Sequence, residues 1–88
     1  MKLDPDFLLR EVAGSMVVVP VGDAAARFNG MIKLNDTGVF LWRRLSEGTD
    51  EDALCTALCA EYDVDEARAR EDIARFIATL RGAKILTD

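Results

Sequence analysis

The stretch 31–45 constrains the fold of this chain most, because it predicts a strand that passes directly into a helix. Residues 31–34 are apolar except for Lys33, and they follow the turn signal Asn29-Gly30. Asn35 offers a side-chain oxygen to the free N–H groups of a helix start. Beyond it, apolar residues recur at the spacing of a buried helical stripe, namely Gly38, Leu41, Trp42 and Leu45.

The segment before this junction is predicted to be extended. Residues 16–21 are rich in β-branched side chains, which favour strands, and the turn signal Ala13-Gly14-Ser15 separates them from the apolar run 7–12. We therefore expect a hairpin over about residues 8–20, with Pro20 at a strand end or an edge. Residues 1–6 are polar and contain a proline, so they are expected to form a loose lead-in.

Residues 24–28 lack β-branched side chains and consist mostly of helix formers, which favours a helical turn. The alternative is a second hairpin, in which a type I′ turn at Asn29-Gly30 joins 25–28 to 31–34.

The part of the chain after the junction is predicted to be helical. The first helix spans 36–46 and ends near Gly48, and the second spans about 50–62 with Thr49 or Asp50 as its cap. The third spans about 64–81. Asp63 is its expected cap, with Glu66 completing a capping box, and Gly82 ends it. Residues 85–86 are expected to fold back on the core.

These elements follow one another in the order β-β-β-α-α-α. A three-stranded antiparallel sheet followed by three helices is an α+β fold, and its topology is winged-helix-like. The 88 residues suffice for a single domain with a small core. We expect residues 1–88 to form that one domain.

Composition excludes several classes of protein. The net charge of −5 argues against nucleic-acid binding, since cationic contacts to phosphate supply most of that affinity. No apolar run approaches the roughly 20 residues of a membrane span, and residues 1–6 lack the basic and apolar regions of a signal peptide. We therefore expect a cytoplasmic protein without a membrane partner. Cys55 and Cys59 lie four residues apart on one helix face, an arrangement unsuited to a disulfide, and are expected to be small core residues.

Catalytic and cofactor-binding motifs are missing from the sequence. It contains no histidine, no glycine-rich phosphate loop and no nucleophile elbow. The acidic clusters 50–52 and 63–66 lack the pattern of a calcium loop and coincide with helix starts, where acidic side chains are favourable. We therefore expect no enzyme, no cofactor and no metal site, and we assign Trp42 to the core.

The predicted sheet must have edges, because a small open sheet leaves N–H and C=O groups unpaired at both sides. Strand 31–34 is short and apolar, with one lysine as its charge. An edge of this kind accepts an extended peptide as a further strand. The alternative is that the chain itself covers this edge, with 22–29 or 85–88.

Two motifs in this order resemble the PqqD family. The first is the junction 34–38, Leu-Asn-Asp-Thr-Gly, leading into the helix with Trp42; the second is 72–80, Asp-Ile-Ala-Arg-Phe-Ile-Ala-Thr-Leu. PqqD is a small protein of pyrroloquinoline quinone biosynthesis, and its broader relatives are recognition elements for ribosomally made, post-translationally modified peptides (RiPPs). The resemblance extends from Phe7 to Leu86. The chain departs from it near the end, where relatives often carry a glycine and this chain has Lys84.

The resemblance implies peptide binding without catalysis. The leader part of a precursor peptide would add as a strand to residues 31–34, in the cleft against the third helix. The module would then present it to a modifying enzyme, often a radical S-adenosylmethionine (SAM) enzyme. The third helix has its own apolar stripe, which contains Ile73 and Ile77. The flank of this stripe formed by Arg70, Ala74 and Arg81 is the expected cleft wall, and Asp72, Phe76 and Thr79 lie on the other flank. The expected peptide-binding residues are thus Met31, Ile32, Lys33, Leu34, Arg70, Ile73, Ala74, Ile77 and Arg81.

Two alternatives stay open. A degenerate winged-helix DNA-binding regulator would share the topology and would need a basic face on the third helix. A self-associating structural module would pair the same strand edge with a second copy of the chain, as a homodimer.

Overall fold

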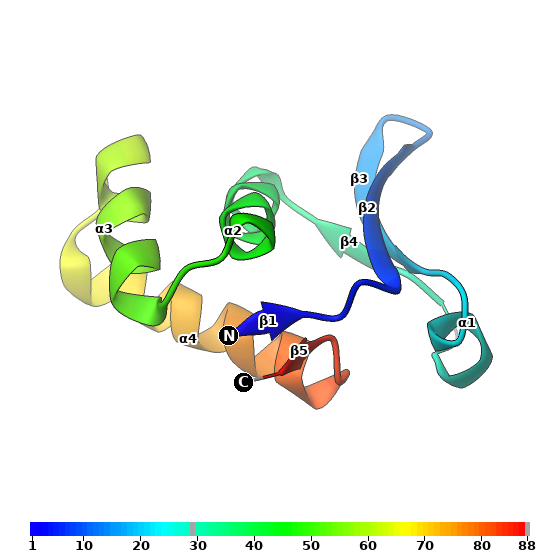
Figure 1. Ribbon diagram of the computed structural model, residues 1–88. Helices are drawn as coiled ribbons and strands as arrows, with labels where there is room; N and C mark the ends of the chain where they lie inside the picture. Colours follow the sequence, from blue (N-terminus) through cyan, green and yellow to red (C-terminus); the bar gives the residue numbers. More distant parts are fainter. Residues whose placement is uncertain (29, 88) are drawn as a thin grey trace.

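The computed structural model describes residues 1–28 and 30–87. In chain order the elements are β1 (Lys2–Leu3), β2 (Phe7–Val12), β3 (Ser15–Pro20), α1 (Ala24–Arg27), β4 (Ile32–Leu34), α2 (Asp36–Glu47), α3 (Glu51–Glu61), α4 (Glu66–Gly82) and β5 (Leu86–Thr87). The sheet β2–β4 lies at one end of the molecule and α3 at the other, with α2 between them, and α4 extends from the α3 end across α2 toward the sheet (Figure 1).

The predicted hairpin is confirmed as β2 and β3. Val12 pairs with Ser15, so the loop contains only Ala13 and Gly14, whose φ angles are 52° and 81°. Two positive φ angles are the signature of the type I′ turn, whose twist matches that of the two strands it joins. The sheet therefore starts from a tight turn encoded locally in the sequence.

Strand β4 completes the three-stranded antiparallel sheet in the order β2-β3-β4. It pairs with β3 through Ile32 opposite Val18 and Leu34 opposite Met16. Among the described residues, no strand pairs with its outer side. β4 is thus an edge strand, and neither 22–28 nor 85–87 adds a strand to it.

The helical turn at 24–28 is confirmed as α1, whose Ala24 is fully buried. Phe28 packs edge-on against Phe7, with 5.4 Å between the ring centroids. Because Ala25 to Arg27 are helical, they cannot form the first strand of the alternative hairpin. Asn29, the first residue of the predicted turn, lies outside the described residues.

The junction between β4 and α2 is confirmed in detail. The Gly38 N–H donates to Oδ1 of Asn35 at 2.8 Å, so Asn35 caps α2. A Cβ on Gly38 would lie 3.3 Å from Cβ of Leu34, so the glycine lets the strand and the helix start approach closely. Leu41, Trp42 and Leu45 are buried, which confirms the stripe and the place of Trp42 in the core.

Helix α3 is capped by Asp50, one of the two expected residues, whose Oδ1 accepts from the Ala53 N–H at 2.8 Å. The expected cap of α4 at Asp63 is wrong. Asp65 takes this role, accepting from the Arg68 N–H at 2.8 Å. The helix starts later because Val64 packs against the core in a turn, its N–H bonded to the Tyr62 carbonyl. A hydrophobic contact here displaces the capping box.

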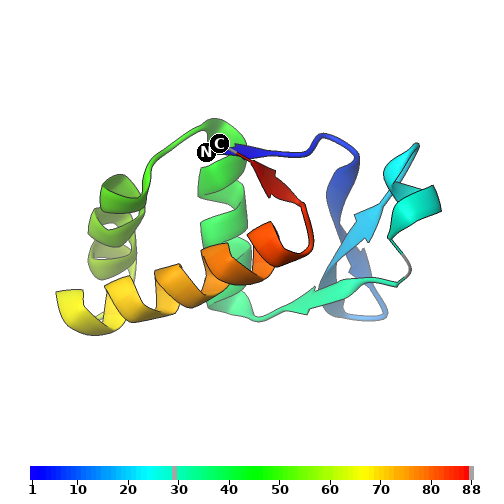
Figure 2. The same ribbon diagram turned by 90° about the horizontal axis from the view of Figure 1, so that it is seen from below.

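The expected loose lead-in at 1–6 is also wrong. Strand β1 pairs with β5 through Leu3 opposite Leu86, and the Asp4 N–H donates to the Ile85 carbonyl at 2.7 Å. The two ends of the chain consequently lie side by side (Figure 2). Ile85 and Leu86 are buried, which confirms that the C-terminal segment folds back on the core.

Lys84 enables this return by adopting a φ of 61° between α4 and β5. This left-handed conformation is one that glycine adopts at little cost and most L-residues do not. The position where the chain departs from the resemblance is therefore one where the backbone favours glycine.

Candidate functional site

The open edge of β4 borders a groove whose opposite wall is α4. Two adjoining hollows, of about 230 and 440 Å³, share Asn35, Gly38, Phe76 and Thr79 and so form one continuous depression. We name it the β4–α4 groove. Its complete lining is Ile32, Lys33, Leu34, Asn35, Thr37, Gly38, Leu41, Arg68, Asp72, Arg75, Phe76, Thr79 and Leu80.

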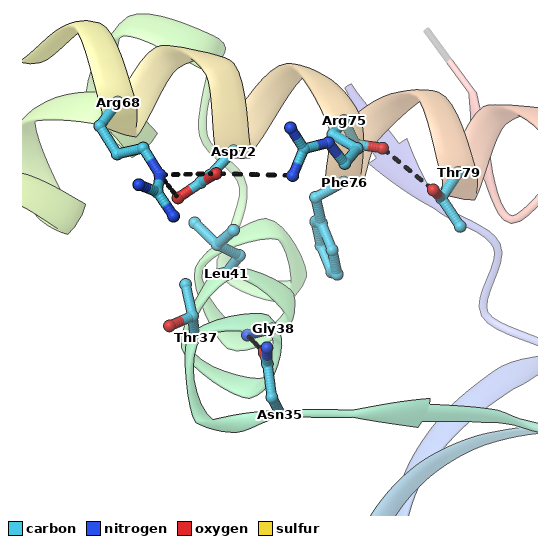
Figure 3. A pocket seen from close by; sticks show the side chains of 9 residues that line it. All are labelled: Asn35, Thr37, Gly38, Leu41, Arg68, Asp72, Arg75, Phe76 and Thr79. Atoms are coloured by element: carbon cyan, nitrogen blue, oxygen red, sulfur yellow. Dashed lines mark hydrogen bonds and ion pairs between the residues drawn. The ribbon is translucent and has the colours of Figure 1, made fainter.

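The end of the groove next to β4 is mainly apolar. Ile32 and Leu34 are half-buried and pack against the core, and Leu80 is buried beneath them. Phe76 projects from α4 toward the start of α2 (Figure 3) and is also half-buried. This end thus combines unpaired backbone groups on the strand edge with an aromatic wall.

The other end of the groove is polar (Figure 3). Asp72 lies between two arginines: Oδ2 is 3.3 Å from Nε of Arg68, and Oδ1 is 3.8 Å from Nη1 of Arg75. Nη2 of Arg75 also donates to Oε1 of Glu71 at 2.9 Å. Both arginine side chains are 68% exposed, whereas Asp72 is 30% exposed. The polar end therefore presents guanidinium groups to solvent.

The structure brings only part of the expected site together. Ile32, Lys33 and Leu34 line the groove, and Met31 lies just before β4 with 58% of its surface exposed. Ile73 and Ile77 are in the core, where they seat α4. Ala74 and Arg81 are exposed and do not line the groove.

Arg70 faces α3 rather than β4. Its Nη1 lies 3.0 Å from Oδ1 of Asp52 in α3, and its Nη2 lies 3.1 Å from Oε1 of Glu66. The hydrogen bond to Asp52 and, to a lesser degree, the one to Glu66 raise the pKa of Arg70 above the ordinary guanidinium value. The expected flank, with Arg70, Ala74 and Arg81, therefore does not line this groove, whereas Asp72, Phe76 and Thr79 do.

Sequence reasoning did not select Asn35, Arg68, Asp72, Arg75, Phe76 and Thr79 as site residues. Helical periodicity placed two flanks beside the stripe but does not tell which one faces β4, because that depends on how α4 crosses α2. One usable signal was Phe76, an aromatic residue at the margin of the apolar stripe of α4. The acids in α3 were a second signal, since they attract the arginine nearest to them.

A separate hollow of about 420 Å³, between α3 and α4, is lined by both cysteines, which are free thiols. Desolvation raises the pKa of Cys59, as do Cys55 and the nearby carboxylates of Glu66 and Asp65. Within residues 1–28 and 30–87, no cluster of side chains is suited to a metal ion. None of the described helices is long and apolar enough to span a bilayer.

Comparisons with known proteins agree with this geometry. The family model of coenzyme PQQ synthesis protein D (PqqD) matches residues 15–86. The structure resembles TbiB1 in complex with the TbiA(beta) leader peptide, with a TM-score of 0.78, 22% identity and full coverage of both chains. It also resembles lasso peptide synthetase B1 complexed with the leader peptide, with a TM-score of 0.73 and 25% identity over 92% of this chain and 89% of that one. No curated protein matches the sequence. The family match spans most of the chain, and this protein therefore belongs to the PqqD family.

Proposed function

We propose that this protein binds the leader segment of a ribosomally made precursor peptide as an added strand on β4. It then presents the peptide to a modifying enzyme, such as a radical SAM enzyme, and performs no chemistry itself. The PqqD family consists of recognition elements for RiPP precursors. Because such precursors are made on ribosomes, we also place this function in the cytoplasm.

The observation that carries the proposal is the open edge of β4 above a partly apolar groove. A peptide in extended conformation gains affinity from main-chain hydrogen bonds to such an edge and specificity from pockets for alternate side chains. Ile32, Leu34 and Phe76 supply the apolar surface for those side chains. Edge and pocket therefore lie together, as strand addition requires.

The two similar structures support this choice. Each contains a leader peptide bound to a protein whose fold this chain shares, over nine-tenths or more of this chain. The whole chain, as one recognition domain, is thus the unit that we expect to bind.

The structure does not favour the DNA-binding alternative. Arg68, Arg70 and Arg75 on α4 each contact a carboxylate, on Asp72, Asp52 and Glu71 respectively. The face that would have to contact phosphate is thus interspersed with negative charge, which opposes binding to a polyanion.

The test is a titration of the isotope-labelled protein with the leader peptide of a precursor encoded beside it, followed by backbone amide NMR. We expect shifts confined to residues 31–38 and to 68–80 on the groove side of α4. Shifts confined instead to the α3 side, around Arg70, would contradict the proposal. So would a dimer that excess peptide leaves intact, since that would indicate that a second copy of the chain occupies the edge.

Proline substitutions test strand addition itself. N–H groups of successive residues in an edge strand point alternately toward the neighbouring strand and outward, so Ile32→Pro and Lys33→Pro remove donors on opposite sides. We expect the variant that loses the outward donor to bind at least about tenfold more weakly while it still folds. Lys33→Ala, which keeps every backbone donor, is the control. If both folded proline variants bound like the parent, strand addition would be excluded.

A further inference from the structure

We propose that the β4–α4 groove selects peptides with an acidic side chain on the N-terminal side of the segment that pairs with β4. Arg68 and Arg75 are the residues that recognise it. This inference rests on the proposed function and specifies which peptides the groove accepts.

The charge of the groove is opposite to that of the whole protein. Among the described lining residues, Lys33, Arg68 and Arg75 are cationic and Asp72 is the one carboxylate, whereas the chain carries a net charge of −5. A locally positive groove on an acidic protein attracts an acidic ligand and repels a basic one. The local charge therefore favours a peptide with at least one carboxylate.

The two arginines retain hydrogen-bonding capacity for a ligand. Arg68 bonds to Asp72 through Nε, and its two Nη groups form no hydrogen bond or ion pair with the described residues of the groove. Arg75 divides its Nη groups between Asp72 and Glu71. A guanidinium group presents its N–H donors as a fork that fits a carboxylate. Asp72 holds both guanidinium groups at the groove wall, since it forms ion pairs with both arginines.

The direction of the peptide follows from the sheet. All strand pairs with β3 are antiparallel, and antiparallel pairing is the more stable arrangement, so an added strand runs antiparallel to β4. β4 runs toward Asn35 and the polar end of the groove (Figure 3). The N-terminal part of the peptide consequently passes over Arg75 and Arg68, and its C-terminal part pairs with β4.

The reach of the arginines sets the position of the acid. From Phe76 back to Arg68 the helix rises by about 12 Å, at about 1.5 Å per residue. An extended peptide covers that distance in about four residues, at about 3.3 Å each. The acidic side chain should therefore lie within about four residues before the apolar side chain that packs on Phe76.

Selection from a displayed library of random peptides, about ten residues long so that they span the groove at about 3.3 Å per residue, tests the inference without a known ligand. We expect bound peptides to be enriched in Asp or Glu at positions preceding an aromatic or aliphatic residue. In peptides that bind, Glu→Gln at the enriched position should weaken binding about threefold to fivefold, the effect of one exposed ion pair.

Matched variants of the protein show which arginines cause the preference for acidic peptides. The double variant Arg68→Gln/Arg75→Gln should lose the acidic preference and bind the selected peptides up to about tenfold more weakly. Arg70→Gln, the same substitution on the same helix, should leave the acidic preference and the peptide affinity unchanged because Arg70 faces α3. The acidic preference should also weaken at high salt.

The outcomes separate this inference from the proposed function. Bound peptides that perturb β4 in NMR spectra but show no acidic preference would overturn the inference and leave the proposed function standing. Equal effects of the double variant and Arg70→Gln would also overturn it. If no peptide were enriched and none perturbed β4, both the inference and the proposed function would fail.

Discussion

The two flanks of α4 both carry arginines but differ in what faces those arginines. On one flank, Arg70 faces α3, and its guanidinium group pairs with Asp52 of α3 and with Glu66 of α4 itself. On the other, Arg68 and Arg75 share Asp72 at the edge of an open groove. The neighbouring element thus decides whether an arginine on this helix links two helices or lines the groove. The residue type alone does not decide between these roles.

The orientation of the two flanks depends first on the buried stripe of α4 between them, which contains Ile73. Ile73→Ala should lower the free energy of unfolding by about 2–4 kcal/mol, because it removes a fully buried side chain from the core. Denaturant unfolding measures this effect. Ala74→Ser, one position further and exposed, should change stability by less than about 0.5 kcal/mol. A loss below about 1 kcal/mol for Ile73→Ala would mean that α4 is not seated through this stripe.

Phe76 should distinguish the groove flank from the rest of the helix. Phe76→Ala removes the aromatic wall of the groove, so we expect about tenfold weaker peptide binding, measured by calorimetry. Tyr62→Ala is a matched control, because Tyr62 is also half-buried and packs edge-on against Phe40, away from the groove. Both variants should lose stability. Only Phe76→Ala should lose affinity, and an equal loss in both would indicate a global effect.

Lys84 provides a test at the end of α4 that both flanks share. Lys84→Gly should raise the free energy of unfolding by about 0.5–1 kcal/mol, because the residue holds a φ of 61°. Lys84→Ala, which keeps the strained conformation, should bring no such gain. Peptide affinity should stay the same in both variants, since Lys84 does not line the groove. Stabilisation by alanine equal to that by glycine would contradict the role of the backbone angle.

The smallest effect is expected at the α3 flank. Because the pKa of Cys59 is raised, mainly by desolvation, the folded protein holds less of the reactive thiolate near neutral pH. Iodoacetamide should therefore alkylate Cys59 more slowly in the folded than in the unfolded chain at about pH 8. The measurement uses the Cys55→Ser variant, in which Cys59 is the single thiol, so that the alkylation rate is that of Cys59.

The same shift fixes the sign of a pH effect on stability. The folded state favours the protonated Cys59 thiol. The contribution of Cys59 to the free energy of unfolding is therefore complete below the pKa of this thiol in the unfolded chain, and it is lost as pH rises through the pKa in the folded protein. Alkylation that is faster in the folded protein would contradict the direction of the shift.

Local patterns predicted those elements whose stabilising contacts are close in sequence. The hairpin of β2 and β3, the Asn35 cap and the stripe of α2 depend on residues a few positions apart, and all were predicted, although the type of the hairpin turn was not. The pairing of β1 with β5 joins the two ends of the chain through strands of two residues, too short for any periodic pattern. The cap of α4 shifted to Asp65 because Val64 packs against the core, a contact that a capping pattern does not reveal.

The sequence by itself determined that β4 leads into a capped helix and that α4 has a buried stripe with a flank on each side, but it left open whether the chain covers the outer edge of β4. Only the tertiary structure decided which flank faces the edge. The physical reason is that periodicity defines the faces of a helix but not its rotation or crossing angle, which depend on the packing of α4 against α2 and α3. That packing placed Asp52 beside Arg70 and left Arg68, Arg75 and Phe76 along the groove.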